Sequence, residues 1–321
     1  MKKIIIATLM SLLSIVETSN INVYAETIYT SMPTKDDNYY RSYRDDLEKF
    51  NLDLQTFSTR KNRFITLDTE NEKFQTEGFN YPDIWIRDVA PVITTKMVKF
   101  RYSPNYLKKS DSNYLNARFN KFLKEKYKYR KSELILDGGN LQWNGAKTVV
   151  LTDQVYNDNR NWSKQEIISE LKYRLKIDKV IIISKEPGDV LGHSDGMIKF
   201  IERNKMFIND FSYEPGFLKK IENQILRQDP HMKFIVLPSS YTSSGQYDSK
   251  IASAKGLYIN MLETEDAVYF PMYGLKKDHQ VLNLVKKEYD KKVIPISVGR
   301  LSTLGGSIHC LTWDVPDRFR K

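Results

Sequence analysis

The sequence predicts an α/β fold built from repeated strand–helix–strand units. Short apolar runs alternate with amphipathic segments, and 40% of the 321 residues are hydrophobic, enough for a sizeable core. The apolar runs that begin at positions 149, 206 and 267 are spaced by 57 and 61 residues. A period near 60 with this content indicates repeated βαβ units. An ordinary doubly wound α/β sheet alternates strands and helices in the same way and stays open as an alternative.

The first residues, 1–25, are predicted to be a secretory signal peptide. Lys2 and Lys3 precede a 13-residue apolar run that ends at Val16, and a polar stretch leads to Ala25. A positive start, a short apolar run and a small-residue cleavage site are typical of an export signal, and the run is shorter than the ~20 residues that span a bilayer. We expect cleavage after Ala25, a secreted or extracytoplasmic protein, and no stable membrane insertion. An uncleaved anchor is the alternative.

The remaining residues, 26–321, are predicted to form a single domain, because no Pro/Gly-rich linker divides them. A loose first copy of the repeat has a strand from Val92, a helix over about 112–129 and a strand over 133–136. The later copies place strands at 149–151, 206–209 and 267–270, helices over about 163–175, 215–228 and 276–289, and strands at 179–183, 233–237 and 293–296.

Two local features add detail to this prediction. Ser163 and Glu166 form a capping-box pattern, which marks the first turn of a helix. The stretch Ser239–Lys255 is rich in serine and polar residues, so we expect a surface loop there, with an active-site lid as the alternative.

Reactive side chains recur at the turns that head the repeats. Asp88, Asn140, His193, Asn260 and Cys310 are separated by 52, 53, 67 and 50 residues, close to the repeat period. A repeat places equivalent positions around one axis, so we expect these residues to converge on a central site. They lie in the segments Trp85-Ile-Arg-Asp-Val-Ala-Pro91, Asp137-Gly-Gly-Asn140, Gly192-His-Ser-Asp-Gly196, Tyr258-Ile-Asn260 and Gly305-Gly-Ser-Ile-His-Cys310.

The single cysteine, Cys310, is predicted to be a nucleophile. One cysteine forms neither an internal disulfide nor a thiolate-only metal site, and an unpaired thiol is an oxidation liability in an exported protein. A buried structural cysteine is the alternative. His193 and Asp195 share a face if their segment is extended, so together they offer a proton carrier and a carboxylate.

The other histidines are not expected to act as the base. On a strand, His309 would point away from the face that Cys310 occupies. His231 and His279 are expected at the surface. Neither a metal nor a cofactor is expected, because thiolate and histidine clusters with metal-ligand spacing are absent, as are the glycine-rich nucleotide motifs.

Paired carboxylates indicate a cationic, planar ligand. A guanidinium offers a rigid fork of donors that carboxylates meet bidentately. Asp88 and Asp195, together with Cys310 and His193, therefore suit attack on a guanidinium carbon. A surface ion pair with Arg87 is the alternative for Asp88.

At these segments the chain resembles the agmatine deiminase and Porphyromonas-type peptidyl-arginine deiminase family of guanidine-modifying enzymes. The likeness covers roughly residues 80–316, and the five segments occur in the family's order. It implies the pentein β/α-propeller, with fivefold pseudo-symmetric ββαβ repeats around a central active site, in which about Glu26–Pro82 completes the fifth unit. It also implies that 26–321 is a deiminase catalytic domain that turns the guanidinium of agmatine, arginine or peptidyl-arginine into a ureido group and ammonia through a covalent cysteine thiouronium.

The resemblance implies a role for each matching residue. Cys310 matches the nucleophile, His193 the general acid/base, and Asp88 and Asp195 the carboxylates that hold the guanidinium. Asn260 matches a pocket residue near the nucleophile. The further substrate-binding candidates in or beside these segments are Asp189, Trp85, Arg87, Asn140 and Gly306.

Other functions remain open from the sequence. An amidinotransferase would use the same cysteine and histidine, and Cys310, His193 and Asn260 could form the set of a thiol hydrolase. The hypothesis outside the enzymes is a basic secreted binding protein, which the net charge of +10 would suit. Lysines and arginines are dispersed without a recognition motif, so we expect a guanidine or arginyl-peptide partner and no nucleic acid.

Overall fold

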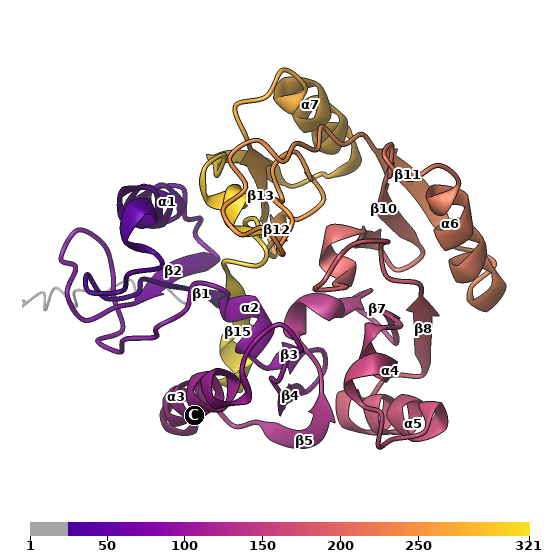
Figure 1. The fold of residues 1–321 in the computed structure, drawn as a ribbon, viewed down its shortest axis with the longest axis horizontal. Coiled ribbons are helices and arrows are strands. Elements are labelled where there is room, and N and C mark those ends of the chain that lie inside the picture. Colours follow the sequence, from indigo (N-terminus) through magenta and orange to yellow (C-terminus); the bar gives the residue numbers. More distant parts are fainter. Residues whose placement is uncertain (1–24) are drawn as a thin grey trace, which may run out of the picture.

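Five three-stranded sheets surround a common centre, and the long helices lie on the outside (Figure 1). The structure, a computed structural model, describes residues 25–321; the predicted signal peptide up to residue 24 lies outside the described residues. In every sheet the middle strand pairs antiparallel with one neighbour and parallel with the other. Helices make each parallel crossover, so the unit is ββαβ. The predicted fivefold pentein β/α-propeller is thereby confirmed, and the single doubly wound sheet is excluded.

Four of the units follow one another along the chain. One contains β3 (Val92–Ile93), β4 (Met97–Arg101), α3 (Lys109–Lys126) and β5 (Arg130–Ile135). The next contains β6 (Gln142–Trp143), β7 (Thr148–Thr152), α4 (Gln154–Asp158), α5 (Lys164–Leu175) and β8 (Lys179–Ile183). It is followed by β9 (Ile198–Glu202), β10 (Lys205–Asn209), α6 (Phe217–Gln228) and β11 (Lys233–Leu237). The last of the four contains β12 (Leu262–Glu263), β13 (Ala267–Met272), α7 (Asp278–Glu288) and β14 (Lys292–Ser297).

The remaining unit closes the ring by joining both ends of the described chain. It consists of β1 (Glu26–Ser31), α1 (Arg44–Thr56), β2 (Asn62–Leu67) and the late strand β15 (Trp313–Pro316). Tyr29 of β1 lies opposite Trp313 of β15, and the two rings stack with centroids 5.6 Å apart. The N-terminal part therefore completes the fifth unit, as the resemblance implied, but it needs a C-terminal strand to do so.

The long elements lie where the sequence predicted them. β8 and β11 match their predicted bounds, and Ser163 forms the predicted capping box with Glu166 at the start of α5. The prediction for Val92 needs correction, because β3 has two residues and the middle strand of that unit is β4. The edge strands β6 and β12 also have two residues each, so they are too short to show an alternating sequence pattern.

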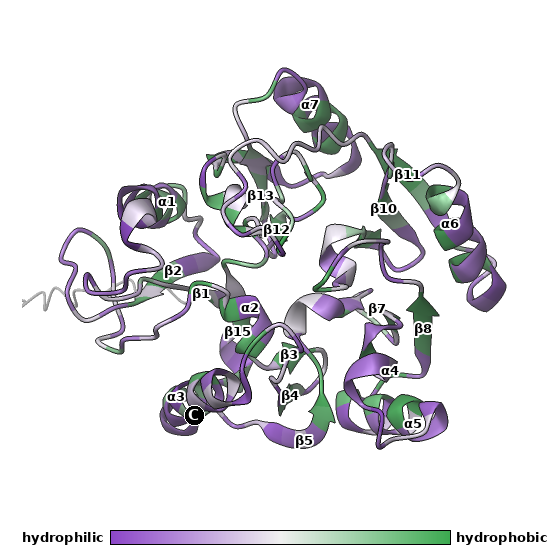
Figure 2. Cartoon of the chain, viewed as in Figure 1, coloured by the Kyte–Doolittle hydropathy of each residue, from purple (hydrophilic) through white to green (hydrophobic). Residues whose placement is uncertain are grey.

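The core lies between the helices and the sheets. All five residues of β7 are buried, and α5 turns Ile167, Leu171 and Leu175 toward it. Figure 2 shows the same arrangement around the ring, with apolar strands and with helices that are polar on their outer side. Among residues 25–321, we find no helix that is both long enough and apolar enough to cross a membrane.

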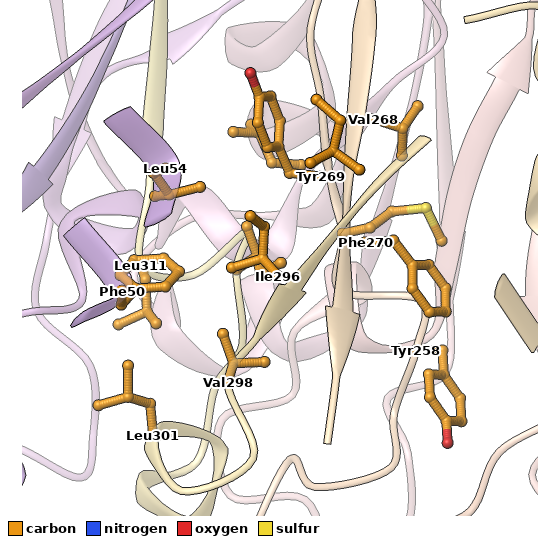
Figure 3. Packing of buried hydrophobic residues seen from close by; sticks show 14 of the residues in the cluster. Phe50, Leu54, Tyr258, Val268, Tyr269, Phe270, Ile296, Val298, Leu301 and Leu311 are labelled. Carbon is orange, nitrogen blue, oxygen red and sulfur yellow. The ribbon is translucent and has the colours of Figure 1, made fainter. Parts of the chain in front are cut away.

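One apolar cluster joins the ring-closing unit to the unit of β13 and β14. Phe50 and Leu54 of α1 belong to the same cluster as Ile296 of β14 and Leu311 (Figure 3). Leu311 directly follows Cys310, so this core anchors the chain beside the predicted nucleophile. Packing of this kind holds a catalytic turn in one geometry because interiors are close-packed.

Candidate active site

Side chains from three inter-strand turns meet around Cys310. Asp195 lies just before β9, and its Oδ2 is 3.5 Å from Cys310 Sγ, in the turn before β15. Asn260, just before β12, links the two: its Oδ1 accepts a hydrogen bond from Cys310 N at 3.3 Å, and its Nδ2 donates to the Asp195 carbonyl at 3.4 Å. All three residues are buried. The structure thus brings together residues that are up to 115 positions apart in sequence.

His193 lies between two carboxylates. Its Nδ1 is 3.6 Å from Asp88 Oδ1, and its Nε2 is 3.2 Å from Asp137 Oδ2. Burial lowers the pKa of His193, but Asp88, Asp137 and Asp195 outweigh it and raise the pKa to about 10. Burial raises the pKa of Asp88 to about 7, with Asp137 and Asp195 adding to the rise and His193 opposing it. His193 is therefore an imidazolium at neutral pH.

The thiol is protonated in the unliganded site. Burial, followed by the carboxylates of Asp195 and Asp88, raises the pKa of Cys310. The pKa of Asp195 is lowered. Burial acts to raise it, but His309, followed by His193 and Arg87, has the larger and opposite effect. A bound cation beside these carboxylates would offset their effect on the sulfur and favour the thiolate.

Two glycines allow the backbone to pass close to the reacting groups. A β-carbon at Gly139 would lie 2.6 Å from Asp88 Oδ1 and 2.9 Å from His193 Nδ1. The Gly139 amide uses this proximity and donates to Asp88 Oδ1 at 3.1 Å. A β-carbon at Gly306 would collide with Trp85 and lie 2.9 Å from the Cys310 β-carbon. A side chain larger than hydrogen at either position would therefore displace residues of the site.

A hollow of about 290 Å³, which we call the front pocket, opens beside the thiol. His193, Asp195, Asn260 and Cys310 form its floor. A smaller hollow, the inner pocket, shares Cys310, His193 and Gly306 with it and adds Trp85, Asp88 and Tyr106. No lysine or arginine of the described chain lines either pocket.

The outer part of the front pocket is acidic and aromatic. Glu186, Asp189, Tyr213 and Tyr241 line it. Burial raises the pKa of Glu186 to about 7, against the opposing effect of a hydrogen bond from Tyr213. The loop Ser239–Lys255 also borders the pocket through Tyr241 and the stretch 252–254, so its position is compatible with the lid alternative.

The predicted substrate-binding residues divide into two groups. Trp85 and Gly306 line the inner pocket, and Asp189 lines the front pocket. The Asp189 carboxylate also accepts hydrogen bonds from the amides of Leu191 and Gly192, at 2.9 and 2.8 Å, and so fixes the turn before His193.

Arg87 and Asn140, which the sequence predicts as substrate contacts, line neither the front pocket nor the inner pocket. Arg87 Nη2 pairs with Asp314 Oδ1 at 2.7 Å, and its side chain lines a separate hollow of about 350 Å³, the rear cavity. Asn140 Oδ1 accepts from the Thr152 amide at 2.9 Å and lines neither substrate pocket. Arg87 is held by the ring-closing unit and Asn140 by β7, so each stabilises the frame of the site.

Two site residues were not predicted from the sequence. Asp137 is the first residue of the segment Asp137-Gly-Gly-Asn140. The signal that could have found it is its acidic side chain, a second carboxylate for the predicted histidine. His309 was expected to be turned away on a strand. Instead Gly305, with φ +114, ends a short 3-10 helix (Leu301–Leu304), and His309 and Cys310 lie in the turn that follows. The His309 ring lines the rear cavity, as the expected opposite orientation suggests, but its Nδ1 reaches Asp195 Oδ2 at 2.7 Å.

The described residues contain no group of three or more His, Cys, Asp and Glu side chains placed to hold a metal ion. The polar groups of the site are instead arranged as a thiol, an imidazolium and carboxylates around a small pocket. Such a set can bind a planar cation and carry out nucleophilic chemistry on it.

Comparison with known proteins identifies the family. Residues 27–316 match the Porphyromonas-type peptidyl-arginine deiminase family. The chain belongs to this family. A curated relative from Enterococcus faecalis, named "Putative agmatine deiminase", is 27% identical over 219 residues, which are 59% of this chain and 60% of the relative. The chain therefore spans about three fifths of the length of that relative.

Solved structures of the family share the fold over a longer range. The C. jejuni agmatine deiminase superposes with a TM-score of 0.74 at 19% identity, over 91% of this chain and 93% of that chain. The Enterococcus faecalis agmatine deiminase gives 0.73 at 18% identity, over 92% and 94%. These likenesses agree with the propeller described above.

Proposed function

We propose that the chain is a guanidine deiminase, which hydrolyses a guanidinium to a ureido group and ammonia. One observation carries the proposal. The buried Cys310 thiol lies 3.5 Å from the Asp195 carboxylate, and it shares the inner pocket with the Asp88 carboxylate and the His193 imidazolium. Membership of the Porphyromonas-type family supports it. The arrangement suits a cation whose central carbon accepts a nucleophile.

Substrate binding is the first step of the proposed mechanism. The guanidinium binds where the inner and front pockets meet at Cys310 and His193, and it donates hydrogen bonds to Asp88 of the inner pocket and Asp195 of the front pocket. Its positive charge favours the ionised form of Asp88, whose pKa lies at about 7 without substrate. The same charge lowers the pKa of the Cys310 thiol, so the thiol gives its proton to solvent on substrate binding and the substrate itself favours formation of the nucleophile.

Bond formation and cleavage follow on the guanidinium carbon. The Cys310 thiolate attacks that carbon to give a tetrahedral adduct. The His193 imidazolium gives a proton to the departing nitrogen, the carbon–nitrogen bond breaks, and ammonia leaves. The remaining group is a thiouronium bonded to Cys310 through sulfur.

Water completes the cycle. His193, now neutral, takes a proton from water, and the hydroxide adds to the thiouronium carbon. The carbon–sulfur bond breaks, which returns the thiolate, and the hydroxyl proton passes to solvent, where ammonia can take it up, so that the neutral ureido product remains. Asp137, 3.2 Å from His193 Nε2, holds the ring in place in both steps.

The tail of the substrate is proposed to be neutral or cationic. Glu186 and Asp189 line the outer pocket, and the lining contains no lysine or arginine that would pair with an α-carboxylate. Agmatine carries an ammonium at that end, internal peptidyl-arginine carries neutral amides, and free arginine carries a carboxylate that the acids would repel. We therefore place agmatine first, internal peptidyl-arginine, which would be citrullinated, second, and free arginine last.

The alternative functions use the same residues and differ in their products. An amidinotransferase would pass the amidino group from Cys310 to an amine in place of water. A thiol hydrolase would cleave peptide bonds without releasing ammonia from guanidines. A basic secreted binding protein would bind an anionic partner in a salt-sensitive way and show no turnover.

Export is proposed on the strength of the N-terminal residues. Lys2, Lys3 and the apolar run that follows have the pattern of a signal peptide, with cleavage after Ala25. Expression with the natural N-terminus should give extracytoplasmic protein whose N-terminal residue is Glu26. Full-length protein retained in the cytoplasm would contradict export.

The test of the proposed function is a ureido-product and ammonia assay on four substrates: agmatine, free arginine, and internal and C-terminal peptidyl-arginine. Turnover of agmatine with the highest kcat/KM is expected. Absence of ammonia release from all four substrates would refute the deiminase, and preference for free arginine would refute the argument about the acidic outer pocket.

A further inference from the structure

His309 contacts the active site without having a role in the proposed chemistry. Its side chain is 12% exposed, and its Nδ1 lies 2.7 Å from Asp195 Oδ2. The same oxygen lies 3.5 Å from Cys310 Sγ. One carboxylate oxygen therefore contacts both the nucleophile and a second histidine.

We propose that His309 is a positioning residue, which donates its Nδ1–H to Asp195 and so holds this carboxylate charged and aimed at the guanidinium. The inference rests on the proposed deiminase function and adds a residue to it. His309 lines the rear cavity, whereas Cys310 and Asp195 line the front pocket. It therefore supports the carboxylate without touching the substrate.

The charge state of His309 fixes the direction of the hydrogen bond. Burial, then the cations Arg87 and Lys199, lower its pKa to about 4, against the opposing effect of Asp195. Asp314, which pairs with Arg87, also interacts with this ring, and Glu202, Glu263 and Lys291 line the same rear cavity. A neutral imidazole beside a carboxylate donates from the nitrogen that faces it, so Nδ1 carries the proton.

The backbone of His309 is held on both sides, which makes the ring a fixed support. Its amide donates to the Asn260 carbonyl at 3.2 Å, and its carbonyl accepts from Arg87 Nε at 3.2 Å. Arg87 is in turn anchored by Asp314 at 2.7 Å and donates its own amide to the Cys310 carbonyl at 3.3 Å. This gives Arg87, which lies outside the substrate pockets, a part in fixing the turn of the nucleophile.

Removal of the ring should act on Asp195 in a definite direction. Burial alone raises the pKa of this carboxyl, and the hydrogen bond from His309 is the largest opposing effect. Without that bond the pKa rises, a larger share of Asp195 is protonated at a given pH, and the guanidinium loses a charged partner. A hydrogen bond to a charged group corresponds to about a tenfold or larger change in binding.

The kinetic experiment compares two substitutions at one position. His309→Ala removes the donor, and His309→Asn places an amide N–H close to where Nδ1 was. For His309→Ala we expect kcat/KM to fall by about tenfold or more, chiefly through KM, with protonation of Asp195 added to the acidic limb that Asp88 sets at about pH 7. His309→Asn should recover most of the loss, and His279→Ala, at an exposed histidine, should behave as wild type.

Either of two results would overturn the proposal. One is His309→Ala protein, folded by circular dichroism, with unchanged KM and an unchanged acidic limb. The other is His309→Asn protein that loses as much as His309→Ala, since ring packing and not the hydrogen bond would then be what matters.

A second measurement does not depend on turnover. The chain has four histidines, so a long-range ¹⁵N spectrum of the labelled protein contains four rings. We expect one neutral ring with the proton on Nδ1 down to about pH 5, absent in His309→Asn and shifted in Asp195→Asn. A charged His309 ring at pH 7, or a proton on Nε2 alone, would refute the inference. Protein with the expected ring signature but no ammonia release would refute the deiminase function instead, so the two failures are distinguishable.

Discussion

The substitution Gly139→Ala tests the geometry of the site with a single methyl group. A β-carbon at this position would lie 2.6 Å from Asp88 Oδ1, 2.9 Å from His193 Nδ1 and 3.1 Å from Asp195 Oδ2. Ordinary contact begins at 3.4 Å, so the Asp88 oxygen would have to retreat by about 0.8 Å. A displacement near 1 Å in a reacting constellation costs on the order of 100-fold in rate, or about 2.7 kcal/mol.

We therefore expect Gly139→Ala to reduce kcat/KM for agmatine by about 100-fold, while the protein stays folded. The assay is ammonia release together with a thermal unfolding curve. Gly196→Ala is the matched control for the unfolding curve, because a β-carbon at Gly196, which lines the front pocket, meets nothing within 4 Å and its φ is not in the left-handed region. Gly139→Ala with near wild-type activity would refute the view that Asp88, His193 and Asp195 act from these positions.

Three further predictions address the charges of the site. The kcat/KM profile should rise through about pH 7, because the ionised form of Asp88 binds the cation, and should fall near pH 10, where His193 loses its proton. Asp137→Asn removes a carboxylate that raises the pKa of His193, so the basic limb should move to lower pH; an unmoved limb would contradict this pairing. Glu186→Gln should raise KM about tenfold for agmatine and leave KM for an internal arginyl peptide nearly unchanged, and equal effects on both substrates would exclude a contact with the ammonium.

The long elements and the period of the fold could be predicted because each repeat contains a buried middle strand and an amphipathic helix. The runs at β7, β10 and β13 carry that signal, and their spacing led to the repeat. The two-residue strands β3, β6 and β12 have no such sequence signal, because they are defined by hydrogen bonds to a neighbouring strand and not by alternating side chains. The closing of the ring by β15 depends on contact between chain ends, which no local pattern reveals.

The residues of the site could be predicted more easily than the directions in which their side chains point. The spacing of Cys310, His193 and Asp88 indicated convergence, and the structure places these side chains around the inner pocket. Their sequence neighbours behave differently: Arg87 adjoins Asp88 but lines the rear cavity, and His309 adjoins Cys310 but also lines the rear cavity. The turn conformation decides which way each side chain points, and a composition of glycines and polar residues allows several turns.

The central claim is that Cys310 forms a covalent bond to the guanidinium carbon. Its most direct test is intact-protein mass spectrometry of acid-quenched turnover with agmatine, followed by peptide mapping. The proposed mechanism predicts an adduct on Cys310 with the mass of the substrate less one ammonia, and its absence in Cys310→Ala protein, which should release no ammonia. Full ammonia release by Cys310→Ala, or an adduct on a different residue, would contradict it.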